Sequence, residues 1–173
     1  MIYYPLETLV KAGIKEILIV TGGEHIGDFF RLLGSGKEWG VHFSYEIQEG
    51  NGGTGAALLL AEDFVRNEEF MVILGDNVVS EDIACFVEDF KKEKEKFKAK
   101  ILIAKVEDPQ NYGVVDLKDR KIVRIVEKPK KPSSHYAVSY THLELACALP
   151  ELCGYDYRTS ETRGPIICFR DSQ

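Results

Sequence analysis

The sequence predicts an α/β protein with a mostly parallel sheet. Up to Lys100, segments of helical periodicity alternate with short strand-like segments, and the connections between them are short. This alternation is typical of a parallel sheet that is covered by helices on both faces. The clearest strand is Phe70–Leu74, an uninterrupted apolar run that is followed by Gly75 and Asp76. Such a run is too short for an ordinary helix and suits a strand buried on both faces.

The elements before this strand follow from spacing and from turn residues. Pro5 suits a first helical turn, and Gly13 and Gly34 suit helix ends. β-Branched runs favour strands, and apolar residues three or four positions apart favour helices. The resulting order is a helix from Pro5 to Gly13, a strand over residues 14–20, a helix over residues 26–33, a strand over residues 41–47 and a helix over residues 56–64.

The rhythm changes after a predicted helix over residues 83–94. Three strands, at residues 101–106, 113–117 and 122–126, are separated by turns with no helix between them. We interpret them as a β-meander that extends the parallel sheet. From residue 139 onward neither a helical nor a strand period is sustained, so we predict a domain over residues 1–138 and a poorly ordered tail over residues 139–173.

Length, composition and charge fit one ordinary globular domain. The 173 residues are 45% hydrophobic and 29% charged, with a net charge of −6 and no basic stripe, which argues against a nucleic-acid partner. The sequence shows no signal peptide and no apolar stretch near transmembrane length, so we expect a cytoplasmic protein with no membrane partner. The cysteines have no zinc-site spacing and are expected to be reduced thiols: Cys85, Cys147, Cys153 and Cys168.

Two stretches of the first half are candidates for binding. The glycine-rich loop over residues 50–55 would let a nucleotide approach the backbone, although it is not a P-loop and, taken alone, is more often a plain flexible connection. Gln48 before it has an amide that is able to bind a base edge, or is an exposed strand end. Asp76 stands where open α/β sheets place ligands, so it is a candidate for a metal or a ribose, with a helix cap as the alternative.

Two further candidates lie in the meander. Gly113 begins a strand and either lets a ligand pack against the backbone or marks a bulge. Glu127 and Lys128 are adjacent, so on a strand they would point to opposite faces and bind different ligand groups, unless they are solvated strand-end charges. The histidines lie in unrelated elements and suggest no catalytic group: His25, His42, His135 and His142.

Several motifs together resemble the sugar-1-phosphate nucleotidyltransferases, most closely the glucose-1-phosphate thymidylyltransferase branch. In order they are MIYYPL (residues 1–6), AGIKEILI (12–19), LGSGKEWG (33–40), ILGDN (73–77), YGVV (112–115) and EKP (127–129), and the similarity runs to Tyr136–Val138. Any one of these motifs is weak, but their shared order and spacing make the resemblance specific.

The resemblance implies a Rossmann-like fold and a chemistry. A sugar 1-phosphate oxygen attacks the α-phosphorus of a nucleoside triphosphate, and pyrophosphate leaves. The implied substrates are dTTP, or another nucleoside triphosphate, and glucose 1-phosphate; the implied cofactor is Mg²⁺, and the implied full-length assembly is a homo-oligomer. Carried over position by position, the metal carboxylate is Asp76, the nucleobase contacts are Gln48 and Gly53, and the sugar-phosphate pocket is formed by Gly113, Glu127, Lys128 and Val138.

The departures from the family also carry predictions. Met1 aligns after the family's central first strand and its glycine-rich loop with Arg and Lys, and no match to the family's second metal-binding Asp follows Val138. We therefore expect this chain alone to be inactive, with a non-catalytic nucleotide-sugar binding module as the alternative. Residues 54–56 differ from the larger residues expected beside the base, which leaves UTP open.

The missing first strand also predicts a structural defect. The strands near residues 17–20 and Phe70–Leu74 would face a gap in the sheet and make the chain poorly stable. Residues 138–143 resemble a translated transposon-end adapter, with a divergent natural terminus as the alternative, so no function is assigned to residues 139–173.

Overall fold

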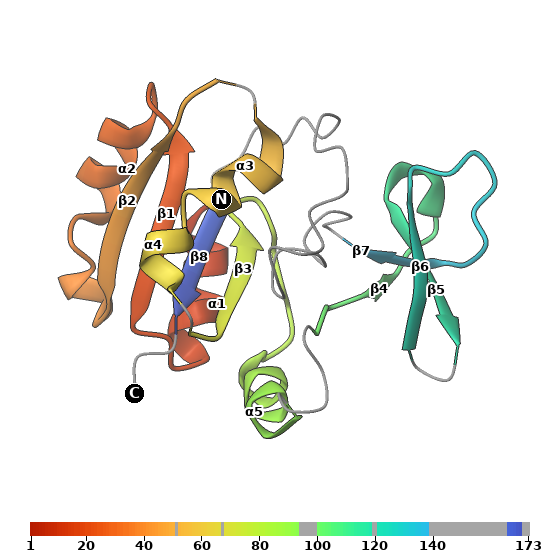
Figure 1. Cartoon of the computed structure of the whole chain (residues 1–173). Helices are drawn as coiled ribbons and strands as arrows, with labels where there is room; N and C mark the ends of the chain where they lie inside the picture. The colour runs from red at the N-terminus through yellow and green to blue at the C-terminus, as the bar shows by residue number, and fades with distance from the viewer. Residues whose placement is uncertain (51, 67, 94–99, 119–120, 139–165, 171–173) are drawn as a thin grey trace. The chain divides into compact units, whose positions relative to one another are not determined.

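The structure, a computed structural model, describes residues 1–50, 52–66, 68–93, 100–118, 121–138 and 166–170 (Figure 1). The side chains of residue 121 and of residues 166–170 are not described. The chain forms two compact units, one of Met1–Glu95 with Gly154–Gln173 and the other of Lys96–Cys153. Each unit is treated by itself below. Cys147, Cys153, His142 and the greater part of the predicted tail lie outside the described residues.

The first unit is an α/β sheet with helices. Its elements are α1 (Tyr3–Lys11), β1 (Glu16–Gly22), α2 (Ile26–Leu33), a 3₁₀ turn η1 (Lys37–Trp39), β2 (His42–Gln48), α3 (Gly53–Leu59), α4 (Glu62–Val65), β3 (Phe70–Leu74), α5 (Ala84–Glu93) and β8 (Ile166–Arg170). The strand order is β2-β1-β8-β3. β1 and β2 are parallel, and β8 is antiparallel to both β1 and β3. Strands β1, β2 and β3 therefore share one direction, as the sequence predicts.

The expected gap beside β1 and β3 is filled by β8, so that prediction is wrong for this structure. Figure 1 shows β8, in blue, between β1 and β3. Its backbone pairs on both sides along its length, with Phe169 opposite both Ile17 and Met71. Residues 166–169 form a short apolar run after Gly164 and Pro165. That apolar run is the sequence signal for a central strand, although the sequence before it shows no regular hydrophobic pattern.

Both faces of the sheet are covered, as expected. Alternation along β1 sends Ile17 and Ile19 to one face and Leu18 and Val20 to the other, and all four are almost completely buried. The first face packs with the apolar side of α1, with Leu33 of α2 and with Ile83. Helices α3 and α4 both contact β8. Their buried residues are Thr54, Ala57 and Leu58 in α3 and Val65 in α4. The sequence-based helix over residues 56–64 is thus two short helices.

Helix α1 ends as its sequence predicts. Gly13 has a φ of +85°, the left-handed value that glycine adopts without a steric penalty. The amide of Ile14 donates to the Leu9 carbonyl at 3.1 Å and that of Gly13 to the Val10 carbonyl at 3.0 Å. These two bonds form a Schellman motif, which satisfies carbonyls that the helix end would leave open.

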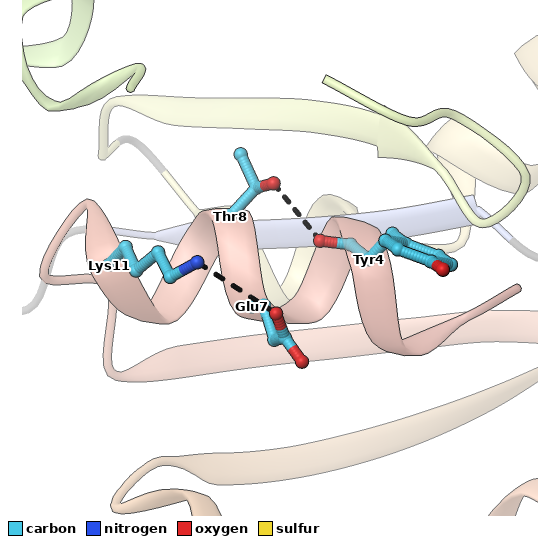
Figure 2. A network of polar contacts seen from close by, with 4 residues as sticks. All are labelled: Tyr4, Glu7, Thr8 and Lys11. Atoms are coloured by element: carbon cyan, nitrogen blue, oxygen red, sulfur yellow. Dashed lines mark hydrogen bonds and ion pairs between the residues drawn. The ribbon is translucent and has the colours of Figure 1, made fainter. Parts of the chain in front are cut away.

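The solvent side of α1 carries its own polar contacts, drawn in Figure 2. The Thr8 hydroxyl donates to the Tyr4 carbonyl at 3.0 Å, and Lys11 Nζ lies 3.8 Å from Glu7 Oε2. Both pairs are exposed, and a surface ion pair at this spacing contributes only about 0.3–0.5 kcal/mol. The stability of α1 therefore comes mainly from its buried face, where Pro5, Leu6 and Leu9 are buried.

The second unit is a separate antiparallel sheet, not an extension of the first sheet as we expected. It contains β4 (Ala104–Lys105), the 3₁₀ turn η2 (Pro109–Asn111), β5 (Gly113–Lys118), β6 (Lys121–Glu127) and β7 (Tyr136–Val138). The strand order is β4-β7-β5-β6, so β7 comes between β4 and β5. The predicted strand over residues 101–106 shortens to β4, whereas the other two predicted strands are confirmed. Within the described residues, no helix is both long enough and apolar enough to cross a membrane.

Candidate substrate-binding site

The carboxyl ends of the parallel strands bring three predicted features to one edge of the first sheet. Gly22 at the end of β1 pairs with Gln48 at the end of β2. Val20 and Leu74 both pair with Ile166, so Asp76, two residues past Leu74, leaves the sheet at the same level as Gly22. The β2 and β3 ends are three strand spacings apart, roughly 14 Å at the usual spacing.

The glycine-rich loop is attached to the end of β2. Nε2 of Gln48 donates a hydrogen bond of 2.8 Å to the carbonyl oxygen of Gly53, so the two residues expected at the nucleobase lie together. Gly50 and Gly53 have φ values of +71° and +69°. A Cβ at Gly52 would overlap Cβ of Ala56 and come within 3.4 Å of Gln48 Nε2. In the described part of the loop, a side chain at position 52 would therefore require Ala56 to shift.

Asp76 is not the cap of the following helix. That helix, α5, begins at Ala84, and its amide donates to Asp82 Oδ1 at 2.9 Å. Asp76 itself is exposed after the buried Gly75, in a turn in which the Asn77 amide donates to the Leu74 carbonyl at 3.0 Å. Asn77 Nδ2 lies 3.5 Å from Asp76 Oδ1. The capping alternative is therefore excluded, and the carboxylate is presented to solvent at the sheet edge.

A divalent cation would find one protein carboxylate at this edge. Among the described residues there is no group of three or more His, Cys, Asp or Glu side chains able to hold a metal ion. Mg²⁺ commonly binds through one or two carboxylates while it keeps waters and substrate phosphate oxygens. An exposed Asp76 fits a metal of that kind, brought by a nucleotide, and does not fit a dedicated protein cage.

The second unit brings together three of the four residues expected at the sugar phosphate. Gly113, the first residue of β5, pairs with Glu127 of β6 on one side and with Val138 of β7 on the other. Gly113 and Val138 are buried, and Glu127 is exposed at the strand end. These residues are separated in the sequence, yet they form one continuous row across the sheet.

Lys128 differs from the prediction. Glu127 and Lys128 were expected on opposite faces, but Lys128 Nζ lies 3.7 Å from Glu127 Oε1. Lys128 has left the strand, with a φ of +42°, so the alternation of a strand no longer governs its direction. Its amide donates to the Tyr112 carbonyl at 3.0 Å, which extends the β5–β6 pairing by one residue. The two charges therefore lie together at the end of the row that contains Gly113.

Each described histidine has its own local contact. His25 and His42 are exposed and lie 3.4 and 3.3 Å from Glu24 and Glu16. His135 contacts the backbone of Val106. Burial raises the pKa of the hydroxyl of Tyr45, a residue of β2, and this hydroxyl donates to the carbonyl of Gly34 at the end of α2 at 2.6 Å. Cys85 is an exposed free thiol.

The fold of the first unit and the residues at its sheet edge indicate the class of protein. A glycine loop and an acidic residue at the carboxyl edge of a Rossmann-like sheet are typical of nucleotide-binding α/β proteins. The family model described as Nucleotidyl transferase matches residues 1–142. The chain therefore belongs to the nucleotidyl transferase family.

Named relatives and solved structures agree with this assignment. The chain is 36% identical over 141 residues to glucose-1-phosphate thymidylyltransferase of Neisseria meningitidis serogroup A, covering 80% of this chain and 48% of that protein. A putative glucose-1-phosphate thymidylyltransferase from Bacillus anthracis, solved with a sucrose, has 48% identity and a TM-score of 0.75 over 79% of this chain and 55% of that one. An apo UDP-glucose pyrophosphorylase has 25% identity and a TM-score of 0.62 over 78% and 61%. The chain spans about half the length of the curated relatives it matches.

Proposed function

We propose that this chain binds dTTP and glucose 1-phosphate for nucleotidyl transfer, which gives dTDP-glucose and pyrophosphate. The observation that carries the proposal is the row formed by Glu127, Gly113 and Val138 in the second unit. A glycine flanked by a carboxylate and by a buried apolar side chain suits a sugar ring, because Glu127 accepts hydrogen bonds from hydroxyls while the backbone at Gly113 allows close approach.

The adjacent cation supplies the second half of the ligand site. The side chain of Lys128 is 66% exposed, and its ammonium nitrogen lies 3.7 Å from Glu127 Oε1. An ammonium next to a sugar-binding carboxylate is suited to the phosphate of a sugar 1-phosphate. When the sugar phosphate binds, Glu127 holds hydroxyls and Lys128 holds the phosphate.

The nucleotide binds at the sheet edge of the first unit. Gln48 and the glycine loop hold the base, and Asp76 holds the metal that accompanies the phosphates. Mg²⁺, when bound, neutralises phosphate charge and orients the triphosphate. In the reaction that this binding serves, the sugar phosphate oxygen would form a bond to the α-phosphorus, the bond from that phosphorus to the β-bridging oxygen would break, and pyrophosphate would leave with the electron pair; this chain alone is expected to bind the substrates without turnover. Positioning supplies much of the rate in such a transfer.

Thymidylyl transfer is favoured over uridylyl transfer. The relatives named glucose-1-phosphate thymidylyltransferase reach 36% and 37% identity, whereas the UDP-glucose pyrophosphorylase structures are at 25% or below. The LGSGKEWG segment also resembles the thymidylyl-transferring branch.

Titration calorimetry tests the proposal on the chain. We expect dTTP with Mg²⁺ to bind more tightly than UTP, and glucose 1-phosphate to bind with an affinity that falls about tenfold in Lys128→Ala, the loss of one charge-assisted contact. Lys118→Ala is the matched control, since Lys118 is an exposed lysine at the other end of β5. No binding of either ligand, or equal losses in the two variants, contradicts the proposal.

Pyrophosphate release then separates an enzyme from a binding module. Release from dTTP and glucose 1-phosphate at about one per second or faster, the low end of ordinary enzymes, would assign the complete reaction to this chain. Binding of both ligands without release would identify the chain as a nucleotide-sugar binding module.

A further inference from the structure

The side chain of Ser134 lies at the point where the backbone pairing of β5 with β7 ends. Two residue pairs join these strands, Gly113 with Val138 and Val114 with Ala137. The next pair in this register would be Val115 with Tyr136. Instead, the Ser134 hydroxyl donates to the Val115 carbonyl at 2.6 Å and accepts from the Tyr136 amide at 3.2 Å. The hydroxyl thus stands where a direct backbone hydrogen bond would close the ladder, and it satisfies both backbone groups.

The residues on either side of Ser134 are attached as well. The Ser133 hydroxyl donates to the Asp116 carboxylate on β5. On the other side, the His135 carbonyl accepts from the Val106 amide at 2.9 Å, next to β4. Residues 133–135 therefore attach the start of β7 to both neighbouring strands. On its β6 side, β5 has a register shift between Asp116 and Leu117, so the regular part of β5 is the part that carries Gly113.

β7 is held by only two residue pairs on its β5 side and by two more on its β4 side, so few backbone hydrogen bonds specify its register against β5. A slip by one residue would turn every side chain of β7 to the other face. Val138 would then no longer pair with Gly113, and its side chain would leave the sheet face that it occupies now. The Ser134 bridge fixes the register at the point where the β5–β7 ladder stops, three residues before the buried Ala137.

We propose that Ser134 is a positioning residue for the sugar-phosphate site. Its hydroxyl sets the register of β7, and through it the place of Val138 beside Gly113. This inference rests on the proposed function, because it assigns the row of Glu127, Gly113 and Val138 to the sugar phosphate. Ser134 itself contacts no substrate in this account and acts through β7.

The test compares Ser134→Ala with Ser134→Thr, which keeps the hydroxyl. We expect the dissociation constant for glucose 1-phosphate to rise about tenfold in Ser134→Ala, the effect of one lost hydrogen-bond bridge, and to stay within about twofold in Ser134→Thr. The affinity for dTTP with Mg²⁺ should not change, because the nucleotide residues lie on the other sheet. Hydrogen exchange at the amides of Tyr136 and Val138 should become faster in Ser134→Ala alone. Ser44→Ala, at a half-buried serine on β2, is the matched control.

The outcomes distinguish a failure of the positioning role of Ser134 from a failure of the proposed function. If the unmodified chain binds glucose 1-phosphate and Ser134→Ala binds it equally well, the positioning role is wrong while the proposed function stands. Equal losses in the alanine and threonine variants would also overturn it, since the hydroxyl would not be the cause. If the unmodified chain does not bind glucose 1-phosphate, the proposed function fails and the positioning role fails with it. Should Ser134→Ala not fold by circular dichroism, Ser134→Cys, which keeps the size but donates weakly, replaces it under the same criteria.

Discussion

Gln48 and Gly53 are joined by a hydrogen bond of 2.8 Å, from the side-chain amide nitrogen of the first to the carbonyl oxygen of the second. The end of β2 and the start of α3 are therefore coupled by the same amide that is proposed to bind the base. A substitution at Gln48 affects the loop and the base contact together.

Gln48→Glu should weaken nucleotide binding. A carboxylate has no hydrogen to donate to Gly53, and its charge would repel both that carbonyl and a triphosphate. We expect the dissociation constant for dTTP to rise about tenfold, as for one lost hydrogen bond near the top of its usual range. Gln110→Glu makes the same change at an exposed position in the second unit and should leave the affinity unchanged. Equal affinities of Gln48→Glu and the unmodified chain in titration calorimetry would refute the base assignment.

Asp76→Asn should remove the Mg²⁺ dependence of nucleotide binding. With one carboxylate at the edge, the metal depends mainly on the nucleotide phosphates, so the loss concerns the metal-dependent part of the affinity. Binding of dTTP in excess EDTA should therefore be the same in both proteins, whereas added Mg²⁺ should strengthen it in the unmodified chain alone. The matched charge control is Asp89→Asn, an exposed position on α5. A full Mg²⁺ response in Asp76→Asn would place the metal elsewhere.

Tyr45→Phe should reduce the pH dependence of stability at high pH. Burial raises the pKa of Tyr45 above its usual value of 10.0, so the unfolded chain ionises first. The contribution to stability is complete below pH 10 and is lost as the pH rises through the higher folded-state pKa. Because the variant lacks the hydrogen bond to Gly34, its free energy of unfolding should be lower by about 0.5–1.5 kcal/mol at neutral pH. Above pH 10 its free energy of unfolding should decline less steeply than that of the unmodified chain. Urea unfolding at a series of pH values measures both, with Tyr4→Phe at an exposed position as control.

Gly36→Ala and Gly13→Ala form a matched pair for the loop before β2. Both glycines are left-handed, at φ of +87° and +85°, and alanine there costs roughly 1–2 kcal/mol. A Cβ at Gly13 would meet nothing within 4 Å, but one at Gly36 would lie 2.6 Å from the Val41 carbonyl oxygen. Overpacking of this kind adds about 1–3 kcal/mol, so Gly36→Ala should unfold at distinctly lower urea. Equal midpoints for the two variants would show that the Gly36 turn opens freely.

Local sequence patterns predict much of the secondary structure. Phe70–Leu74 is a strand with the predicted bounds, because a five-residue apolar run before a glycine allows few other states. Gly13 ends α1 because its left-handed φ suits few other residues. Gly113, Glu127 and Val138 were assigned to one pocket by resemblance, and strand register brings them into one row.

Other features depend on long-range or special geometry that no local pattern contains. The Ser134 bridge requires β5 and β7 to be already adjacent, so nothing in the sequence near Ser134 marks it. Lys128 was placed by strand alternation, which stops at the residue where the strand ends and φ becomes positive. The position of β8 was missed for the same kind of reason, because pairing with β1 and β3 joins residues from opposite ends of the chain.

The last prediction concerns β8. Ile167 pairs with Ile19 on one side and with Ile73 on the other, so its backbone amide belongs to a ladder whichever neighbour accepts it. Ile167→Pro removes that amide and adds a ring to the middle of a central strand, where proline is essentially excluded. We expect a loss of about 1–3 kcal/mol for each buried backbone group left without a partner, seen as a lower melting temperature and as new binding of a dye that reports exposed apolar surface.

Ile167→Val is the control, since it keeps the amide and the β-branched shape, and it should melt close to the unmodified chain. The comparison tests the sheet order itself. If β8 closes the sheet, then only the proline variant leaves β1 and β3 with unpaired backbone groups, the defect expected of a sheet that lacks its central strand. A cooperative, dye-silent melt that Ile167→Pro does not change would mean that β1 and β3 are stable without β8. In that case the strand order β2-β1-β8-β3 would not describe the protein in solution.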